Sequence, residues 1–371
     1  MWIDRNQESR LGVFERVADS KHEQIVFNYD EQSGLRAIIA IHSTALGPAL
    51  GGTRFFHYDS EDQALEDVLR LARGMTYKAA AAGLDLGGGK AVIIGDPARD
   101  KSERIFRAYG RAIDSLNGRY ITAEDVGTTT EDMELIRRET RWALGTSVVE
   151  GGSGDPSPAT ARGLVAALRA VVAFRWGDTT LEGRRVAVQG VGKVGYAFAR
   201  LLVEERVEVI VSDSHEAATE RAVADLGVKA VGQNDIFSVD CDVFSPCALG
   251  AIFNAETIPK LACQAVVGSA NNQLASSLDA KELDRKGILY APDFVVNAGG
   301  LINVYEELRG YSKARAMHRV DNLQQATTRI LQAAQQLGVI PLVAAETLAE
   351  ERIAAIGDLR RWYRPTLSVL A

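Results

Sequence analysis

The feature that most constrains the fold is a glycine-rich turn between an apolar strand pattern and a helical one. The turn, residues 190–195, follows the apolar run 186–189 and leads into apolar residues at helical spacing over 194–203. Glycines at these positions permit a tight turn and let a pyrophosphate approach the backbone, and a helix N-terminus attracts an anion. The pattern therefore predicts a dinucleotide site formed by Gly190, Gly192, Lys193, Val194 and Gly195. The alternative is a plain strand-to-helix turn whose glycines serve packing alone.

The segments after this turn continue to alternate between strand and helix patterns. Apolar residues at 207–212 predict the next strand and those at 217–226 the next helix, so we expect right-handed βαβ units around a parallel sheet. Asp213 follows the strand and would accept hydrogen bonds from the ribose hydroxyls of a bound nucleotide. Its charge would repel a 2′-phosphate, and no arginine lies in the following turn, so NAD is favoured over NADP as the cofactor.

The composition excludes several functional classes. At 371 residues the chain is long enough for two or three domains, each with its own core. A net charge of −7 argues against a nucleic-acid surface, which needs a basic stripe. No stretch approaches 18 uninterrupted apolar residues and the N-terminus lacks a hydrophobic signal region, so we expect no membrane span and no signal peptide.

The cysteines and histidines give no metal-binding pattern. Cys241, Cys247 and Cys263 form an odd set without metal-ligand spacing, and the five histidines are scattered along the chain. We therefore expect reduced thiols in a cytoplasmic protein, and no bound metal.

A stretch rich in glycine, proline and serine is the best candidate for a domain boundary. In residues 151–158, Asp155 followed by Pro156 has the pattern of an N-cap at the start of a helix over 159–174. We expect an α/β protein of two domains, divided at this stretch into residues 1–150 and 151–339, the second of which binds the nucleotide.

The two ends of the chain also carry recognisable patterns. The tail from Ser312 is helical by composition, and we expect a C-terminal helix at about 340–371 to pack back on the first domain. In the first domain we expect, in order, a hairpin over 25–42 with its turn at 30–34, a helix over 63–80, a strand at 91–95, a helix over 102–116, a strand at 119–122 and a helix that begins at Thr130.

Two lysines lie at the edges of apolar elements, where a merely solvated charge is unusual. Lys78 falls at the border of the apolar stripe of the helix over 63–80, and Lys90 follows three glycines and precedes an apolar strand. A charged lysine can clamp a carboxylate. A lysine that is partly desolvated and crowded by a second cation loses basicity and can act as a base near neutral pH.

Five further residues have polar or turn-forming character near predicted strand ends. Asp125 follows the strand at 119–122, at the end that faces a ligand crevice in open α/β sheets, and a capping role fits its pattern equally well. The other four are interpreted as turn residues, and they would contact a ligand only if the fold brings them together: Gly51, Gly52, Asn271 and Asn272.

At these residues the chain resembles the superfamily of glutamate, leucine, phenylalanine and valine dehydrogenases, and most closely the leucine dehydrogenases. The resemblance extends from about Glu23 to about Arg352. The stretches that carry it are GPALGG at 47–52, MTYK at 75–78, GGGK at 87–90, AEDVG at 123–127, PCALG at 246–250, SANNQL at 269–274 and NAGG at 297–300.

The resemblance implies roles for individual residues. Lys78 matches the lysine that binds the substrate α-carboxylate, with help from the backbone at Gly51 and Gly52. Lys90 matches the catalytic lysine, and Asp125 matches the aspartate that handles protons of the amino group. The positions that match the surroundings of the nicotinamide and its ribose are Thr160, Ala248 and Asn271, with Asn272 and Asn297 nearby.

The resemblance also implies a reaction and an architecture. The reaction is the reversible, NAD-dependent oxidative deamination of an L-amino acid, in which Lys90 deprotonates the water that attacks the imine. The fold has an N-terminal α/β substrate domain and a Rossmann-type, doubly wound NAD-binding domain, and a cleft separates them. The implied partners are a small amino acid and further copies of the same chain, in a homo-oligomer.

The residues that match the family's side-chain pocket are aliphatic. Leu50 stands where glutamate dehydrogenases carry a lysine, and a buried carboxylate against it would be unfavourable by several kcal/mol, so glutamate is rejected. Ala123, Leu301 and Val304 complete a wall suited to leucine, isoleucine or valine. Leucine dehydrogenases more often have valine where this chain has Leu301, and one methylene discriminates by only about 1–3 kcal/mol.

Two alternative functions remain open on the sequence. Within the same enzyme class, the substrate could be an aromatic amino acid, phenylalanine or tryptophan. In a different class, the chain could be a catalytically silent NAD-binding regulatory protein, although Lys78, Lys90 and Asp125 are all retained. Two further departures from the family pattern are Lys193, which could strengthen pyrophosphate binding, and Ala251, for which we have no explanation.

Overall fold

The computed structural model describes residues 12–248 and 250–360, and the chain divides into two compact units. Unit 1 contains Met1–Asp155, Glu307–Tyr311 and Glu350–Ala371, and unit 2 contains Pro156–Glu306 and Ser312–Ala349. The chain first passes between them at Asp155 and Pro156, inside the glycine- and proline-rich stretch. The segment Glu307–Tyr311 belongs to unit 1, although it lies within the range that we assigned to the second domain.

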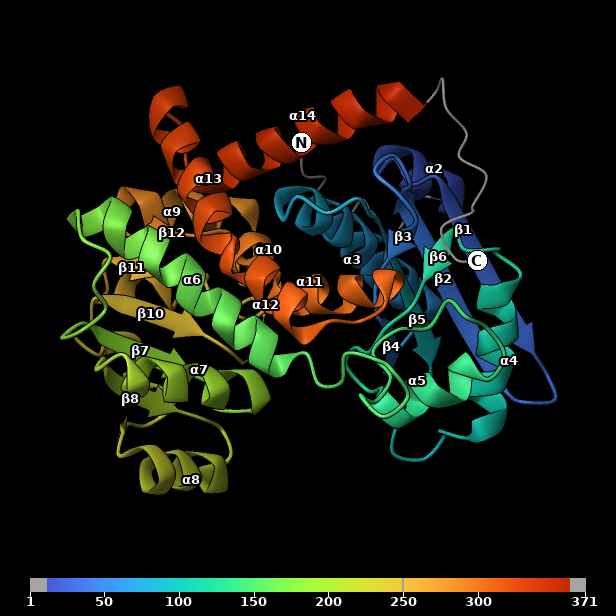
Figure 1. Cartoon of the computed structure of the whole chain (residues 1–371), viewed down its shortest axis with the longest axis horizontal. Coiled ribbons are helices and arrows are strands. Elements are labelled where there is room, and N and C mark those ends of the chain that lie inside the picture. Colours follow the sequence, from blue (N-terminus) through green and yellow to red (C-terminus); the bar gives the residue numbers. More distant parts are fainter. Residues whose placement is uncertain (1–11, 249, 361–371) are drawn as a thin grey trace. The chain divides into compact units, whose positions relative to one another are not determined.

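Unit 1 is built on a mixed sheet with strand order β1-β2-β5-β3-β6, in which β4 also pairs with β5 (Figure 1). β1 and β2 form the predicted antiparallel hairpin, and β5 is antiparallel to β2. β3 and β4 pair with β5 in parallel, and β6 is parallel to β3. The strands are β1 Gln24–Asp30, β2 Leu35–Ser43, β3 Ala49–Leu50, β4 Thr53–Phe56, β5 Gly87–Ile94 and β6 Tyr120–Ile121.

Ser60, Ser102 and Thr129 cap the N-termini of three helices of unit 1. The Ser60 side chain accepts a hydrogen bond from the backbone N–H of Gln63, and Thr129 forms a capping box with Asp132. Apolar residues of α3 pack on β2 and β5, where Leu65 and Val68 meet Val92. The helices are α2 Val13–Asp19, α3 Glu61–Ala81, α4 Glu103–Asp114 and α5 Thr130–Arg137.

The three glycines before Lys90 lie inside a strand, which corrects our expectation of a strand that begins only at residue 91. They have ordinary extended backbone, and close packing is the reason for glycine here. A Cβ added to Gly87 would lie 1.9 Å from the Ser43 carbonyl oxygen, and one added to Gly88 would lie 2.1 Å from the Thr76 nitrogen. The backbone of β5 therefore touches β2 on one side and α3 on the other, with Lys90 in mid-strand.

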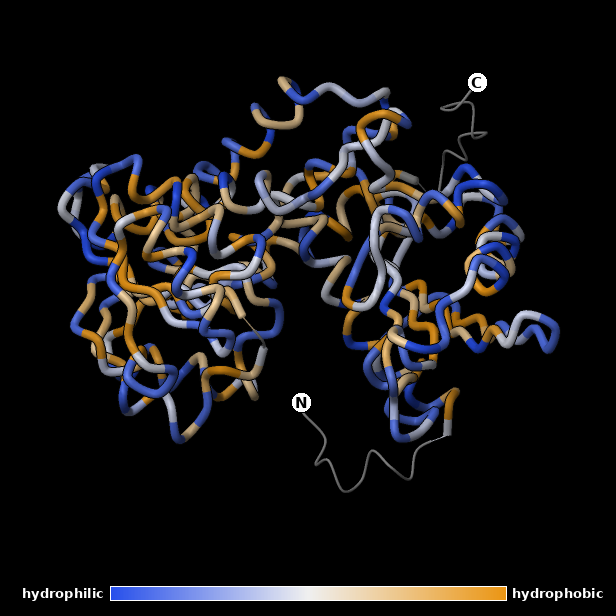
Figure 2. The backbone as a smooth tube through the Cα atoms, turned by 90° about the horizontal axis from the view of Figure 1, so that it is seen from below, coloured by the Kyte–Doolittle hydropathy of each residue, from blue (hydrophilic) through white to orange (hydrophobic). Residues whose placement is uncertain are grey.

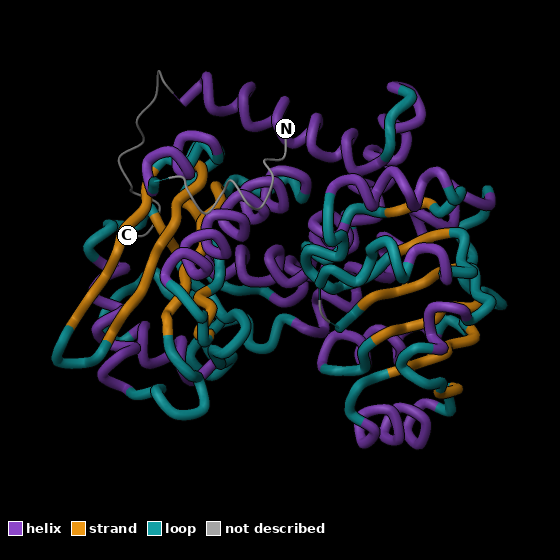
Figure 3. Tube along the Cα trace, turned by 180° about the vertical axis from the view of Figure 1, so that it is seen from behind, coloured by secondary structure: helices purple, strands orange, loops and turns teal. Residues whose placement is uncertain are grey.

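Unit 2 contains an entirely parallel sheet with strand order β12-β11-β10-β7-β8-β9, as the alternation of patterns predicts. The strands are β7 Arg185–Gln189, β8 Glu208–Ser212, β9 Lys229–Ala230, β10 Val243–Pro246, β11 Ala265–Val266 and β12 Leu289–Tyr290. Figure 3 shows these strands as a row within the helices and loops of this unit. The doubly wound α/β arrangement is thus confirmed.

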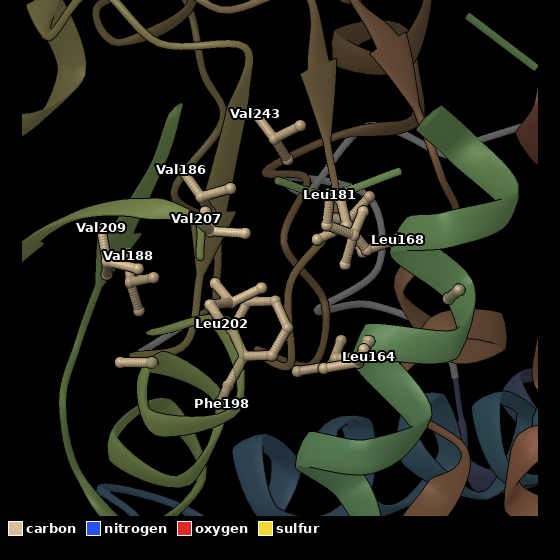
Figure 4. Packing of buried hydrophobic residues seen from close by; sticks show 14 of the residues in the cluster. Leu164, Leu168, Leu181, Val186, Val188, Phe198, Leu202, Val207, Val209 and Val243 are labelled. Atoms are coloured by element: carbon tan, nitrogen blue, oxygen red, sulfur yellow. The ribbon is translucent and has the colours of Figure 1, made fainter. Parts of the chain in front are cut away.

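The core of unit 2 lies between the sheet and its helices. Leu164 and Leu168 of α6 pack with Phe198 of α7 and with Val186 and Val188 of β7 (Figure 4). In both units the apolar stretches run through the interior and the polar ones gather in outer loops (Figure 2). The helices are α6 Ser157–Trp176, α7 Lys193–Glu204, α8 Glu216–Leu226, α9 Ser277–Arg285, α10 Asp293–Val296, α11 Gly299–Tyr305, α12 Lys313–Asp321 and α13 Leu323–Leu337, with 3-10 turns at Asp235–Ser238, Ile258–Lys260 and Glu306–Arg309.

Helix α6 begins differently from our prediction. Its N-cap is Pro156, which makes no side-chain capping bond, and Asp155 is not the cap. Proline is tolerated there because the first N–H groups of a helix have no intrahelical partner. The start of α6 is therefore set by the proline and not by an aspartate cap.

The last helix, α14 Pro341–Arg360, contributes its final residues to unit 1. The Tyr77 hydroxyl donates to the Glu350 carboxylate at 2.6 Å, and the Arg352 guanidinium donates to the Leu84 carbonyl at 2.8 Å and to Asp85 at 2.9 Å. The remainder of the C-terminal helix that we expected, residues 361–371, lies outside the described residues.

The three cysteines are free, and Cys241 and Cys263 are buried. Burial raises the pKa of the Cys241 thiol to about 12 and that of Cys263 to about 11, so both stay protonated. Within the described ranges, no helix combines the length and apolar character that a bilayer-spanning helix needs. The cellular compartment stays a prediction.

Candidate active site

The centre of the candidate site in unit 1 is a buried ion pair between Lys90 and Asp125. The Lys90 Nζ lies 2.7 Å from the Asp125 Oδ2, and Lys90 is only 6 % exposed. Burial raises the pKa of Asp125, but the neighbouring Lys90 and Arg54 cations outweigh this effect and hold it below its usual value. The aspartate therefore stays ionised near neutral pH.

The loop that carries Asp125 is fixed to the neighbouring strand. The Asp125 N–H donates to the Thr128 Oγ1 at 2.9 Å, and the Thr128 hydroxyl lies 2.9 Å from the carbonyl oxygen of Thr53, its acceptor on β4. Gly127 has φ +80°, and an added Cβ would lie 1.9 Å from the Phe55 carbonyl oxygen. Because Thr128 closes this turn, the Asp125 carboxylate is available to pair with the two cations.

The two glycines between β3 and β4 allow three segments to meet. A Cβ on Gly51 would lie 1.8 Å from the Gly89 carbonyl oxygen, and one on Gly52 would lie 2.9 Å from the Asp125 Cβ. The Tyr120 hydroxyl donates to the Gly51 carbonyl at 2.6 Å, which orients this peptide. The turn therefore lies directly against both the lysine strand and the aspartate loop.

The end of helix α3 reaches the same place. Lys78 is half-buried, as its position at the edge of the apolar stripe predicts. Two residues before it, Thr76 contacts the backbone of Gly88, and Met75 lies 3.3 Å from the Cβ position of Gly51. The last turns of α3 and the strand that carries Lys90 are thus packed together.

In unit 2 each glycine of the glycine-rich turn has a separate structural role. Gly190 has φ +95°, and a Cβ there would lie 2.8 Å from the Ala248 Cβ. A Cβ on Gly195 would lie 1.9 Å from the Gly190 carbonyl oxygen, so helix and turn pack closely. A Cβ on Gly192, the N-cap of α7, would meet nothing within 4 Å, and α7 has no side-chain cap.

Asp213 follows β8 and holds the glycine-rich turn in place. Its Oδ2 accepts the Val191 N–H at 2.7 Å, and its Oδ1 accepts the His215 N–H at 2.9 Å. Burial raises its pKa, but these hydrogen bonds outweigh burial and hold the pKa below its usual value. The Oδ2 keeps a further lone pair for another donor, whereas the Oδ1 also accepts from the Ser214 hydroxyl at 3.5 Å.

Asn297 and Asn271 lie together near the end of the sheet in unit 2. The Asn297 Nδ2 donates to the Asn271 Oδ1 at 2.8 Å and to the Ser269 carbonyl at 3.1 Å. The Asn297 Oδ1 is buried and has no hydrogen-bond partner among the described residues. The Thr160 hydroxyl donates to the Pro156 carbonyl oxygen. A Cβ added to Gly300 would lie 2.8 Å from the Thr160 Oγ1.

Comparison with known proteins identifies the family. Residues 21–142 match the sequence model of the Glu/Leu/Phe/Val dehydrogenase dimerisation domain, and residues 151–222 and 217–360 match that of glutamate, leucine, phenylalanine and valine dehydrogenases. The chain belongs to the Glu/Leu/Phe/Val dehydrogenase family. It is therefore an amino-acid dehydrogenase, a class of enzyme that uses NAD or NADP.

The relatives of this dehydrogenase differ in the amino acid that their names specify. The chain is 52% identical to a leucine dehydrogenase of Bacillus cereus, over 95% of this chain and 96% of the relative. It is 48% identical to a phenylalanine dehydrogenase of Lysinibacillus sphaericus, over 94% and 93% of the two chains. The solved L-tryptophan dehydrogenase of Nostoc punctiforme superposes with a TM-score of 0.82 at 44% identity, over 94% of this chain and all of that one.

The four residues that we predicted to line the side-chain pocket are all buried, two in each unit. Leu50 on β3 and Ala123 after β6 are buried in unit 1. Leu301 and Val304 are buried on α11 in unit 2, three residues apart on one face of the helix. Asn272, also in unit 2, has φ +53°.

Arg54 is a residue of the dehydrogenase that the sequence analysis missed. Its Nε lies 3.4 Å from the Asp125 Oδ2, so a carboxylate stands between Arg54 and Lys90. We expected a second cation to crowd Lys90, but the direct ion-pair partner of Lys90 is an anion, and the second cation lies beyond it. The sequence feature that could have indicated Arg54 is its position two residues after Gly52, on the four-residue strand β4.

Proposed function

We propose that this enzyme catalyses the reversible, NAD-dependent oxidative deamination of a branched-chain L-amino acid, giving the 2-oxo acid and ammonia. The observation that carries the proposal is the buried ion pair of Lys90 and Asp125, 2.7 Å apart on glycine-lined backbone. A lysine whose charge is simply hydrated lies on the surface and not in the middle of a buried strand. An ammonium group and a carboxylate at that spacing can pass protons to and from a small zwitterion.

The residues of unit 1 supply binding and proton transfer in this proposal. Lys78 would bind the substrate α-carboxylate, together with the backbone at Gly51 and Gly52. Asp125 would take up the proton that the substrate ammonium group loses. Lys90 would remove a proton from the water molecule that attacks the imine carbon, and the C–N bond would then break to release ammonia.

The residues of unit 2 would hold the dinucleotide. Support comes from the open space at Gly192, the uncapped N-terminus of α7 and the unpartnered Asn297 oxygen, which could accept a hydrogen bond from a carboxamide. NAD, when bound, accepts the hydride from the substrate Cα. The remaining contacts would come from Gly190, Gly195, Lys193, Val194, Thr160, Ala248 and Asn271.

Asp213 supports NAD over NADP. Its two carboxylate oxygens are fixed by backbone N–H groups, and its side chain is only 12 % exposed. A fixed anion accepts hydrogen bonds from two ribose hydroxyls and repels a 2′-phosphate. Initial rates with NAD and NADP at equal concentration test this choice, and faster turnover with NADP would contradict it.

The aliphatic character of Leu50, Ala123, Leu301 and Val304 supports a branched-chain substrate, as does the leucine dehydrogenase relative at 52% identity. An aromatic substrate is the second candidate because phenylalanine and tryptophan dehydrogenases are also similar to this chain. The deciding experiment measures NADH formation with leucine, valine, isoleucine, phenylalanine and tryptophan. An aromatic substrate that leads by tenfold or more in kcat/KM would reject the branched-chain proposal.

We also propose that the enzyme works as a homo-oligomer. The support is that residues 21–142 match a family domain described as a dimerisation domain. Light scattering coupled to size-exclusion chromatography measures the mass directly. A species of about 40 kDa, the mass of one chain, would contradict this part of the proposal.

A further inference from the structure

Arg54 links two buried carboxylates of unit 1. It lies on β4, with its Nε 3.4 Å from the Asp125 Oδ2 and its Nη1 2.8 Å from the Asp67 Oδ2. The three side chains are between 14 and 20 % exposed. Burial lowers the pKa of Arg54, but the two carboxylates outweigh this effect and hold it above the usual value. The guanidinium is therefore a permanent positive charge next to the aspartate of the site.

Asp67 holds the guanidinium through its Nη1, whereas Asp125 contacts its Nε. Asp67 lies on α3, and the Tyr58 hydroxyl also donates to its Oδ2, at 2.7 Å. Burial and the Asp67 carboxylate raise the pKa of Tyr58, so the phenol stays a neutral donor. Arg70 donates to the other oxygen of Asp67 at 2.9 Å, but its own side chain is about half exposed. Arg54 is thus held by a network that Asp67 anchors to the helix.

We propose that Arg54 is a positioning residue that keeps Asp125 ionised and correctly oriented while Lys90 gives up and regains its proton. This inference rests on the function proposed above, in which Lys90 acts as the base. Asp125 has two cationic partners in the structure, and only the arginine keeps its charge when the lysine is deprotonated. A buried carboxylate without a cation takes up a proton, and Asp125 could then no longer accept one from the amino group.

The other titratable groups near Asp125 cannot replace the charge of Arg54. Tyr120 on β6 is neutral, because burial raises its pKa to about 12. Glu124, the preceding residue, is an acid whose oxygen accepts a hydrogen bond from the Thr130 hydroxyl. The elements that adjoin Asp125 carry the charged or titratable side chains Arg54 from β4, Lys90 from β5, Tyr120 from β6, Glu124 from the same loop, and Asp67 and Lys78 from α3. Lys78 is the further cation in this set, and in the proposed function its charge pairs with the substrate α-carboxylate.

The test compares Arg54→Gln with Arg70→Gln in the full-length enzyme. Both substitutions remove an arginine that pairs with Asp67, but only Arg54 also pairs with Asp125. Removing the Arg54 charge raises the apparent pKa of the Lys90–Asp125 pair, so the acid limb of kcat/KM against pH should move up by about one pH unit. We expect kcat at pH 7 to fall about 10- to 100-fold, with KM for the amino acid changed less than about threefold.

Two further variants separate charge from folding. Arg54→Lys keeps a cation and should leave the acid limb within about 0.3 pH units of the wild type, while its lost fork geometry lowers kcat. Asp67→Asn keeps Arg54 but loosens it, and should lower kcat without removing the charge. If Arg54→Gln does not fold, an unchanged kcat in Asp67→Asn overturns the inference on its own.

The outcomes distinguish this inference from the proposed function. A wild type and an Arg70→Gln variant that both oxidise amino acids, beside an Arg54→Gln variant with an unshifted acid limb, would overturn the inference alone. A lower kcat in Arg54→Gln with the same pH profile gives Arg54 a merely structural role and also overturns it. A wild type that does not reduce NAD with any amino acid overturns the proposed function, and the inference with it.

Discussion

The candidate sites of the two units are assembled in opposite ways. In unit 2 the glycine-rich turn is formed by residues close in sequence, because Gly190, Gly192 and Gly195 all lie in one six-residue strand-to-helix connection. In unit 1 the ion pair joins residues 35 positions apart, and glycines from a third segment make room for it. Local backbone geometry builds one site, and long-range packing around buried charge builds the other.

This difference predicts how each site responds to substitution. The unit 1 site depends on the chemistry of a few side chains, so a substitution there should abolish turnover and leave cofactor binding intact. The unit 2 site depends on the absence of side chains, so its sensitivity should follow the space at each glycine. The predictions below test this contrast, from the largest expected effect to the smallest.

The largest effect is expected from Lys90→Ala. The substitution removes the proposed base and leaves Asp125 paired with Arg54, so kcat should fall by about 10³-fold or more. NADH binding, followed by fluorescence titration, should stay within about threefold of the wild type because its proposed residues lie in unit 2. Lys281→Ala on the exposed face of α9 is the control. Near-normal turnover in Lys90→Ala would remove Lys90 from the mechanism.

The same contrast explains how much of the structure could be predicted from the sequence. The first part of the parallel sheet of unit 2 was predictable because each of its strands, turns and helices has its own sequence pattern. Asp213 was predictable because it directly follows β8. The hairpin of β1 and β2 and helix α3 were predictable for the same reason. These elements are specified by neighbouring residues.

What failed depends on contacts between distant segments. We expected the strand to begin only after the three glycines and Lys90, and only the approach of Thr76 and Ser43 explains why extended backbone requires glycine there. Arg54 could not be found by pattern, because its meaning comes from Asp125, 71 residues later. The side-chain pocket stays a prediction, and its residues come from separate segments of the chain.

The second largest effect is expected from Leu50→Lys. Leu50 is 2 % exposed, and an ammonium group in its place would meet an apolar substrate side chain without a counter-ion. We expect kcat/KM for leucine to fall about 100-fold, mainly through KM. Leu50→Met, which nearly conserves volume, should stay within about tenfold. Unchanged leucine kinetics in Leu50→Lys would show that Leu50 does not line the pocket.

A pair of alanine substitutions tests the glycine-rich turn of unit 2. Gly195→Ala places a Cβ 1.9 Å from the Gly190 carbonyl, so we expect it to reduce the free energy of unfolding by about 1–3 kcal/mol and to weaken NADH binding. Gly192→Ala meets open space, so stability should change by less than about 1 kcal/mol while the Kd for NADH rises about tenfold. Urea unfolding and NADH titration measure both quantities. Equal loss of stability in the two variants would contradict the separate roles of these glycines.

The smallest effect concerns pH, and it should be confined to unit 1. Burial lowers the pKa of His22 to about 4 and that of His42 to about 3, and the His22 Nε2–H donates to the Leu69 carbonyl at 3.0 Å. In the unfolded chain both histidines titrate near pH 6.5, so between about pH 6.5 and pH 4 the unfolded state binds more protons than the folded state. Acidification through this window therefore destabilises unit 1.

After allowance for partial solvent exposure, we expect the two histidines together to reduce the free energy of unfolding by about 1–3 kcal/mol between pH 7 and pH 5. A His22→Gln variant, whose neutral amide can still donate to Leu69, should lose less stability over that interval than the wild type. His215→Gln is the control, because that side chain is 85 % exposed in unit 2. Hydrogen exchange at pH 5 and pH 7, corrected for intrinsic rates, resolves the two units. A larger loss of protection in unit 2 than in unit 1 between pH 7 and pH 5 would reverse the contrast between them.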